Sequence, residues 1–319
     1  MKRVAPYLVS IAILAIIYWR VDTAELWNAI RHADPFFVGV GVLLTIPVVG
    51  LITLRLSRMA PRGQHFGYVE SLRISLASAV LKLALPSGAG VVGKVWFLKQ
   101  RGHMSYSLAA SLVLFEKVSD VLALLALCAA GILLTFQPAS FHYTTAAIAG
   151  PGFLGGAMML GSRPLARAVF GGVRRILPRP LEEKVNRAES EWRLMQDHLL
   201  ANPWRLADFA LESLLISLLF LLQIHVFALA LRPDVPLMAS IGWAPLAVLA
   251  GLMPLTLGGY GTRDAAFVLL YGAYLDAPAA AALGLLSSLR YLIPAVIGAP
   301  FVGEMRRRYA PVTKAGLKG

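Results

Sequence analysis

Three charged side chains lie inside one long apolar segment of the sequence. Glu116, Lys117 and Asp120 are ten to fourteen residues into the run 107–135, which places them near mid-depth if this run spans a membrane. An ionised group at that depth costs about 2.5–3.5 kcal/mol, so three together need ionic partners or water. The two carboxylates are four residues apart and share a helix face. The cluster is either a structural ion-pair network or the lining of a polar cavity.

Further ionisable side chains in other apolar segments could pair with this cluster. They are Lys82, Lys94, Arg263, Asp264 and Arg290. Arginine favours partners that accept two parallel hydrogen bonds, such as carboxylate or phosphate. The eight groups together carry five positive and three negative charges. A cavity that gathers them would suit an anionic ligand, such as a lipid phosphate, better than a metal ion.

Two glycine-rich breaks interrupt apolar segments close to these charges. The first, GAGVVGK at 88–94, has the spacing of a nucleotide-binding loop, but no strand–helix–strand unit surrounds it and Val95 stands where a P-loop needs Ser or Thr. It is either a turn that permits close packing or a phosphate site formed by backbone N–H groups near Gly90. The second break contains further candidate binding residues, Gly258, Gly259 and Gly261.

The composition excludes a water-soluble globule, a disordered chain and a nucleic-acid-binding domain. Of the 319 residues, 58% are hydrophobic and 15% are charged, whereas soluble domains are about 45–50% apolar and about 25% charged. Cys128 is the single cysteine, so no intramolecular disulfide can form. No catalytic constellation, metal site or cofactor motif is evident. We therefore expect a single all-α transmembrane domain over 1–319.

Apolar runs predict about six spanning helices and two re-entrant hairpins. The expected spans are 4–19 (an uncleaved first span), 36–54, 107–135, 141–160, 206–231 and 277–302. The segments 74–98 and 237–274 contain the glycine-rich breaks. Neither half of the first could cross about 30 Å of hydrocarbon, so both segments are predicted to be broken helices whose tips lie in protein or water.

The loop charges predict the orientation of the chain. With hairpins that enter and leave on one side, 23 basic residues, among them the loop residue Arg55, fall on one side of the membrane and three on the other. The positive-inside rule then gives a multi-pass protein of the cell (inner or plasma) membrane with both termini cytoplasmic.

The region 161–205 is predicted to be a cytoplasmic loop that contains an amphipathic helix. Apolar residues recur from Leu181 at helical spacing, and Trp192 lies among them. We expect this helix to lie on the inner membrane surface. The alternative is a helix packed on the protein's own cytoplasmic end.

The order span, broken hairpin, span occurs twice, in 36–135 and again in 206–302. By the predicted orientation the two hairpins enter from opposite sides. Such an inverted repeat is the arrangement in which many transporters hold a site near the membrane midplane.

Three stretches resemble the lysylphosphatidylglycerol synthase/flippase transmembrane-domain family. LPSGAGVVGK at 85–94 is similar to its P-x-R-x-G-E-x-x-R, EKVSD at 116–120 to its E-R-x-x-D, and PLTLGGYGTRD at 254–264 to its P-x-x-x-G-G-x-G-x-R-E; Arg290 matches a later membrane arginine. The chain departs from the family pattern at Gly88, Val91, Lys94 and Lys117. The first stretch has thus lost a charge pair, which puts the shared substrate in question.

The resemblance implies movement of a polar or phosphate-bearing lipid, or of a lipid-linked precursor, between leaflets. Its partners would be membrane lipids with anionic headgroups. Fused family members also carry a soluble aminoacyl-transferase domain, for which this chain has no room, so synthase activity is not expected. The alternatives are a membrane-embedded transferase acting on a lipid phosphate and a secondary transporter of small solutes.

Overall fold

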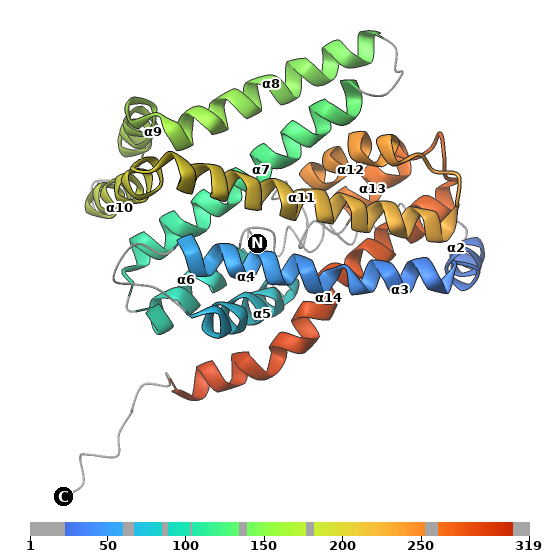
Figure 1. The fold of residues 1–319 in the computed structure, drawn as a ribbon, viewed down its shortest axis with the longest axis horizontal. Coiled ribbons are helices and arrows are strands. Elements are labelled where there is room, and N and C mark those ends of the chain that lie inside the picture. Colours follow the sequence, from blue (N-terminus) through green and yellow to red (C-terminus); the bar gives the residue numbers. More distant parts are fainter. Residues whose placement is uncertain are drawn as a thin grey trace, which may run out of the picture.

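The computed structural model describes residues 23–59, 67–84, 89–102, 104–133, 139–176, 182–252 and 261–308. Every regular element within these ranges is an α-helix, which confirms the predicted all-helical class (Figure 1). The expected first span, 4–19, lies outside the described residues. The helices are α2 (Thr23–Arg31), α3 (Pro35–Leu43), α4 (Thr45–Met59), α5 (Tyr68–Ala84), α6 (Ala89–Gly102), α7 (Tyr106–Leu133), α8 (Ala139–Gly161), α9 (Arg163–Ile176), α10 (Glu182–Leu200), α11 (Pro203–Leu231), α12 (Leu237–Leu252), α13 (Thr262–Leu270) and α14 (Ala277–Arg308).

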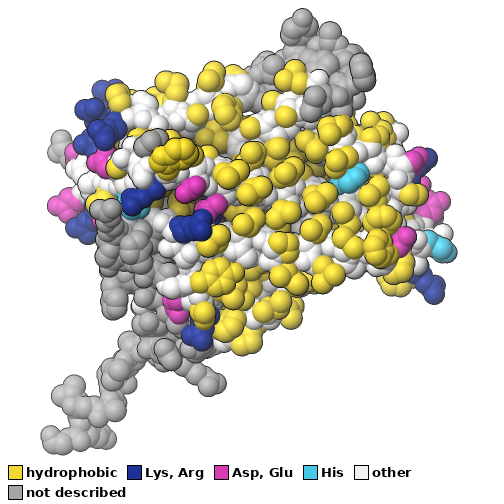
Figure 2. All heavy atoms as spheres, in the orientation of Figure 1, with side chains coloured by type: hydrophobic (Ala, Val, Ile, Leu, Met, Phe, Trp, Pro, Cys, Tyr) yellow, Lys and Arg dark blue, Asp and Glu magenta, His cyan; other side chains and the backbone are white. Residues whose placement is uncertain are grey.

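Three helical stretches are long and apolar enough to cross a membrane: Pro35–Met59, Trp204–Leu231 and Ala277–Gly303. Helix α7 has 28 residues, about 42 Å at 1.5 Å per residue, but it carries the three charged side chains noted above. Hydrophobic side chains cover the middle of the face in Figure 2, and charged side chains gather at its two ends. These features confirm a helical membrane protein, while the number of six spans stays a prediction.

The first helices of the two predicted copies begin in the same way. Asp34 before α3 and Asn202 before α11 each accept a hydrogen bond from the backbone N–H two residues further on, at 2.8 and 3.0 Å. A proline follows at the first helical position in both. An Asx cap followed by proline satisfies the N–H groups that a helix start leaves without partners.

Both interrupted segments form two short helices each, as predicted. Helices α5 and α6 have 17 and 14 residues, and α12 and α13 have 16 and 9. At 1.5 Å per residue the longest is about 25 Å, shorter than the hydrocarbon core of about 30 Å. The connecting residues 85–88 and 253–260 lie outside the described part of the chain, and the re-entrant path stays a prediction.

The two copies pack reciprocally, because the first hairpin helix of each lies along the last helix of the other. Helix α5 packs along α14, and α12 packs along α7. A glycine permits each close approach: a Cβ on Gly298 would overlap the carbonyl oxygen of Leu76, and one on Gly131 would lie 2.5 Å from the backbone nitrogen of Gly242. Small residues let helix backbones meet in this way.

Paired helices of the two copies run in opposite directions in Figure 1. Helices α3 and α4 run against α11, and α7 runs against α14, while α5 and α6 occupy one half of the molecule and α12 and α13 the other. The charged segment of α7 thereby lies between the two copies.

The region 161–205 contains two helices, α9 and α10, where the sequence predicted one. The apolar face of α10 packs on the protein: Trp192 is fully buried and its ring centroid lies 4.2 Å from that of Phe115 in α7. Met195 and Leu199 are buried in the same cluster. The expectation that this face rests on the membrane is therefore wrong, and the alternative, packing on the end of the protein, describes it.

Candidate functional site

A cavity of about 100 Å³ lies between α4, α5, α6, α7, α11 and α14. It is bounded by helices of both copies and contains most of the charged residues singled out in the sequence. The charged groups in its lining are Arg55, Lys82, Lys94, Glu116, Lys117, Asp120 and Arg290. The structure therefore brings together six of the predicted site residues and adds Arg55.

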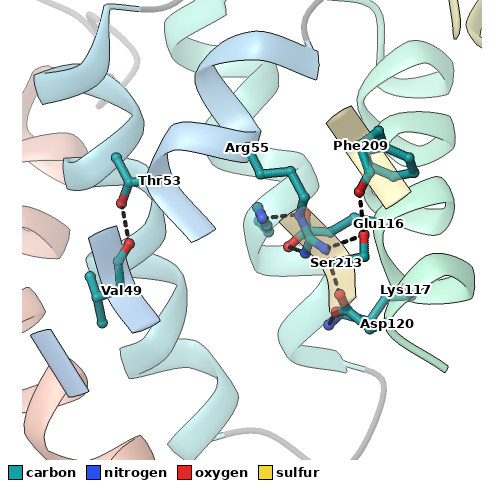
Figure 3. Close-up of polar contacts among 9 residues, drawn as sticks. Val49, Thr53, Arg55, Glu116, Lys117, Asp120, Phe209 and Ser213 are labelled. Atoms are coloured by element: carbon teal, nitrogen blue, oxygen red, sulfur yellow. Dashed lines mark hydrogen bonds and ion pairs between the residues drawn. The ribbon is translucent and has the colours of Figure 1, made fainter. Parts of the chain in front are cut away.

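Arg55 occupies the centre of the charged cluster, as Figure 3 shows. Its Nη2 lies 3.1 Å from Oε1 of Glu116, and its Nη1 lies 2.7 Å from Oδ1 of Asp120. Nη1 also donates to the hydroxyl of Ser213 in α11 at 3.0 Å. With 1% of its surface exposed, Arg55 links α4, α7 and α11.

The prediction that Arg55 lies in a cytoplasmic loop is wrong. The apolar run ends at Leu54, but α4 continues for one more turn to Met59. Arg55 is thus part of the helix and faces the interior. The basic residues counted on the cytoplasmic side fall from 23 to 22, which leaves the predicted orientation unchanged.

Two lysines complete a chain of alternating charges. Nζ of Lys94 in α6 donates to Oε2 of Glu116 at 2.5 Å, and Nζ of Lys117 donates to Oδ2 of Asp120 at 2.8 Å. The order is Lys94, Glu116, Arg55, Asp120, Lys117, and we call these five residues the ion-pair chain. Because it has three cations and two carboxylates, each carboxylate has two cationic partners and one positive charge remains in excess.

The other two cations of the cavity lie outside the ion-pair chain. Among the described residues no carboxylate lies within ion-pair distance of Lys82. Arg290 donates to the hydroxyl of Tyr291 at 2.7 Å, and its guanidinium lies 5.2 Å from the ring centroid of Phe220. The charged residues of the described lining are therefore five cations and two carboxylates.

Arg263 and Asp264 form a separate cluster and are not part of the described cavity lining. Nη2 of Arg263 donates to Oδ1 of Asp264 at 3.0 Å, to the carbonyl oxygen of Gly284 at 3.0 Å and to Ser288 at 2.7 Å. The same two residues thus fasten the start of α13 to α14. The expectation that they share one cavity with Glu116 is wrong in this structure, although the guanidinium of Arg263 lies 5.7 Å from the ring of Tyr291, which lines the cavity.

The predicted glycine sites are described only in part. Gly261 has a φ of 98°, a conformation that side chains with a Cβ rarely adopt, and its N–H donates to Oδ2 of Asp264 at 3.0 Å. Gly90 lies in the first turn of α6, and nothing is described of its surroundings. Gly258 and Gly259 lie outside the described residues. A phosphate site at the glycine breaks stays a prediction.

Within the described ranges no group of three His, Cys, Asp or Glu side chains could hold a metal ion. The carboxylates of the site are instead occupied by arginine and lysine. The chemistry that the arrangement offers is electrostatic: fixed cations, with hydrogen-bond donors, around a small polar space.

Comparison with known proteins gives one match. The model of the family described as "Lysylphosphatidylglycerol synthase TM region" matches residues 3–298, which include the first copy, all but the last four residues of the second copy, and every residue of the cavity. No curated protein and no solved structure matches the chain. The family resemblance seen in the sequence is therefore confirmed over nearly the whole length.

Proposed function

The chain belongs to the lysylphosphatidylglycerol synthase TM-region family, and from this premise we propose that it moves a phosphate-bearing lipid, or a lipid-linked precursor, between the leaflets of a membrane. The observation that carries the proposal is the excess of cations in a cavity between two reciprocally packed halves. Five cations and two carboxylates line it. A headgroup would enter the cavity while its acyl chains stay in the bilayer.

The fixed cations would lower the barrier to crossing. A phosphate loses its hydration in hydrocarbon, and an uncompensated charge there costs several kcal/mol. Lysine and arginine side chains that already point into the cavity replace that hydration with charge-assisted hydrogen bonds. Within the cavity, Lys82 is a candidate to contact the phosphate, because no carboxylate of the described residues pairs with it, and Arg290 lines the same space.

The size of the cavity indicates that it must widen during transport. A volume of about 100 Å³ holds about three water molecules, whereas ligand pockets commonly measure about 300–1,000 Å³. We propose that the two copies form an inverted repeat and that the cavity opens alternately to each side. The crossings of α5 with α14 and of α7 with α12 are where one copy would move against the other.

The proposed location is the cell (inner or plasma) membrane, with both termini on the cytoplasmic side. The distribution of basic loop residues supports this orientation. The end that carries α9 and α10 would then face the cytoplasm.

A transport assay tests the proposal. Purified protein is reconstituted into vesicles with an acyl-labelled anionic phospholipid, and the fraction that a membrane-impermeant reductant bleaches is followed over time. We expect Lys82→Gln and Arg290→Gln each to slow lipid movement about tenfold or more, since a charge-assisted hydrogen bond contributes about 1.5–3 kcal/mol. The matched control is Arg232→Gln, which removes an exposed arginine paired with Asp234. Wild-type rates in both cavity variants would contradict the proposal.

A further inference from the structure

A second and larger pocket lies at the α10 end of the molecule. Its volume is about 410 Å³, and α4, α10 and α11 line it. This volume is in the range of pockets that hold small-molecule ligands, unlike that of the charged cavity. The Arg, Asp and Glu residues in its lining are Arg58, Arg205, Asp208 and Glu212, and we call this pocket the vestibule.

One face of α11 leads from the vestibule toward the ion-pair chain. Arg205, Asp208 and Glu212 follow one another at three and four residues and therefore lie on one side of the helix. The apolar span begins at Trp204, so Glu212 lies about 12 Å along it at 1.5 Å per residue. The next residue, Ser213, accepts the hydrogen bond from Arg55. Polar groups thus continue from the end of the span to the centre of the site.

Phe209 connects the vestibule lining with the charged cluster. Its side chain lines the vestibule and is buried, and its ring centroid lies 5.9 Å from the guanidinium carbon of Arg55 (Figure 3). Since Arg55 lines the charged cavity, Phe209 is the residue of the vestibule lining that lies next to the ion-pair chain.

The charged groups of the vestibule can exchange partners. Arg58 pairs with Glu212 at 2.8 Å, but 59% of its side chain is exposed, and such pairs contribute little to stability. Neither Arg205 nor Asp208 has an ion-pair partner among the described residues. Two arginines on facing helices are therefore available to one phosphate, which they can bind through several parallel hydrogen bonds.

The vestibule also lies next to the start of the candidate span Trp204–Leu231, where lipid headgroups are expected. Trp204, at the start of the same helix, is 76% exposed, and exposed tryptophans at the ends of spans mark the membrane–water interface. A ligand at Arg205 could therefore keep its acyl chains in the bilayer.

We propose that the vestibule is a docking site for the phosphate of a membrane phospholipid, held by Arg58 and Arg205 before it passes Phe209 to reach Arg55. This proposal rests on the proposed translocation. Arg58 would leave Glu212 when the phosphate arrives. The docked lipid would then move along α11 to the charged cavity. The vestibule would therefore determine the affinity for the lipid, and the charged cavity would determine the maximal rate.

The experiment measures transport and binding on the full chain. Vesicles with increasing mole fractions of labelled phosphatidylglycerol give the half-saturating mole fraction and the maximal rate. Binding of the same lipid to the detergent-solubilised protein is followed by fluorescence anisotropy. The variants are Arg205→Gln, Arg58→Gln and the conservative Arg205→Lys. The control is Arg163→Gln, which lies at the same end and pairs with the exposed Asp197.

We expect Arg205→Gln and Arg58→Gln to raise the half-saturating fraction and the dissociation constant about tenfold, which is the loss of one charge-assisted hydrogen bond. The maximal rate should change less than about twofold, and Arg205→Lys should recover only part of the affinity, because lysine keeps the charge but not the parallel hydrogen bonds. If Arg205→Gln and Arg58→Gln gave the same half-saturating fraction and dissociation constant as Arg163→Gln, the docking site would be refuted. The proposed translocation would be unaffected by that result. Arginine-dependent binding without transport by the wild type would instead support the docking site and refute translocation. Equal competition by soluble glycerol phosphate would overturn the assignment to a lipid.

Discussion

Replacing Glu116 with glutamine removes the carboxylate that joins two buried cations. The side chains of Arg55, Glu116 and Lys94 are 1%, 6% and 8% exposed, so water cannot take over the lost interactions. Breaking a buried ion pair by removing one partner costs about 3–5 kcal/mol. We expect Glu116→Gln to lower the free energy of unfolding by about this amount, because Lys94 then loses its carboxylate partner and Arg55 keeps only the carboxylate of Asp120.

A double-mutant cycle separates this pairing from the rest of the cost. If Lys94→Met is added to Glu116→Gln, the second change should cost far less than it does in the wild type, with a coupling of about 2–3 kcal/mol. The pair Lys117–Asp120 provides the comparison, since its side chains are 32% and 21% exposed. Its coupling should be about 1 kcal/mol or less, because solvent screens it.

The assay is reversible unfolding of the detergent-solubilised protein by titration with a denaturing detergent, followed by circular dichroism. The exposed pair Arg163–Asp197, at 59% exposure for both side chains, gives the baseline and should show a coupling near zero. We expect the coupling energy to be largest for Lys94–Glu116, smaller for Lys117–Asp120 and smallest for Arg163–Asp197, because the side chains are increasingly exposed in that order. Equal couplings, or additive effects at Lys94 and Glu116, would mean that the ion-pair chain is hydrated and that burial does not determine its strength.

Two further predictions concern packing. Gly131→Ala should cost about 1–3 kcal/mol, because its Cβ would lie 2.5 Å from backbone atoms of Gly242 that cannot move aside, whereas Gly155→Ala, with nothing within 4 Å, should change the unfolding midpoint little. Trp192→Ala should cost about 3–5 kcal/mol because Trp192 is fully buried, while Trp204→Ala should stay within about 0.5 kcal/mol because Trp204 is exposed. The same unfolding titration measures all four variants. A large loss of stability in Trp204→Ala together with no loss in Trp192→Ala would contradict the packing described for α10.

The charged cavity could be anticipated from the sequence because charge in an apolar helix is costly. Glu116, Lys117 and Asp120 required partners, and Lys94 was among the few cations at a suitable depth. Arg55 was missed because hydropathy locates a residue along the chain but not around the helix. It directly follows an apolar run, as the first residue of a loop does, and only the extra turn of α4 turns it inward.

Tertiary contacts explain the other differences. The spacing of Arg263 and Asp264 places them after a break, but it does not reveal that the carbonyl of Gly284 and the hydroxyl of Ser288 lie within reach. In the same way, the apolar face of α10 follows from helical periodicity, but periodicity does not determine whether lipid or protein covers that face. The packing of α10 against α7 depends on how the rings of Trp192 and Phe115 fit together.

Stability alone does not account for the charges in the cavity. Each ionised group at this depth costs about 2.5–3.5 kcal/mol, and replacement of a buried ion pair by apolar side chains of similar volume is often neutral or stabilising. The ion-pair chain recovers much of that cost for its own five members, because every carboxylate has two cationic partners. Lys82 adds a cation on the wall of the same cavity; its side chain is exposed, and no carboxylate of the described residues compensates its charge. A bound phosphate would supply the missing negative charge, so the feature that is hardest to explain as packing is the one that transport of a lipid phosphate requires.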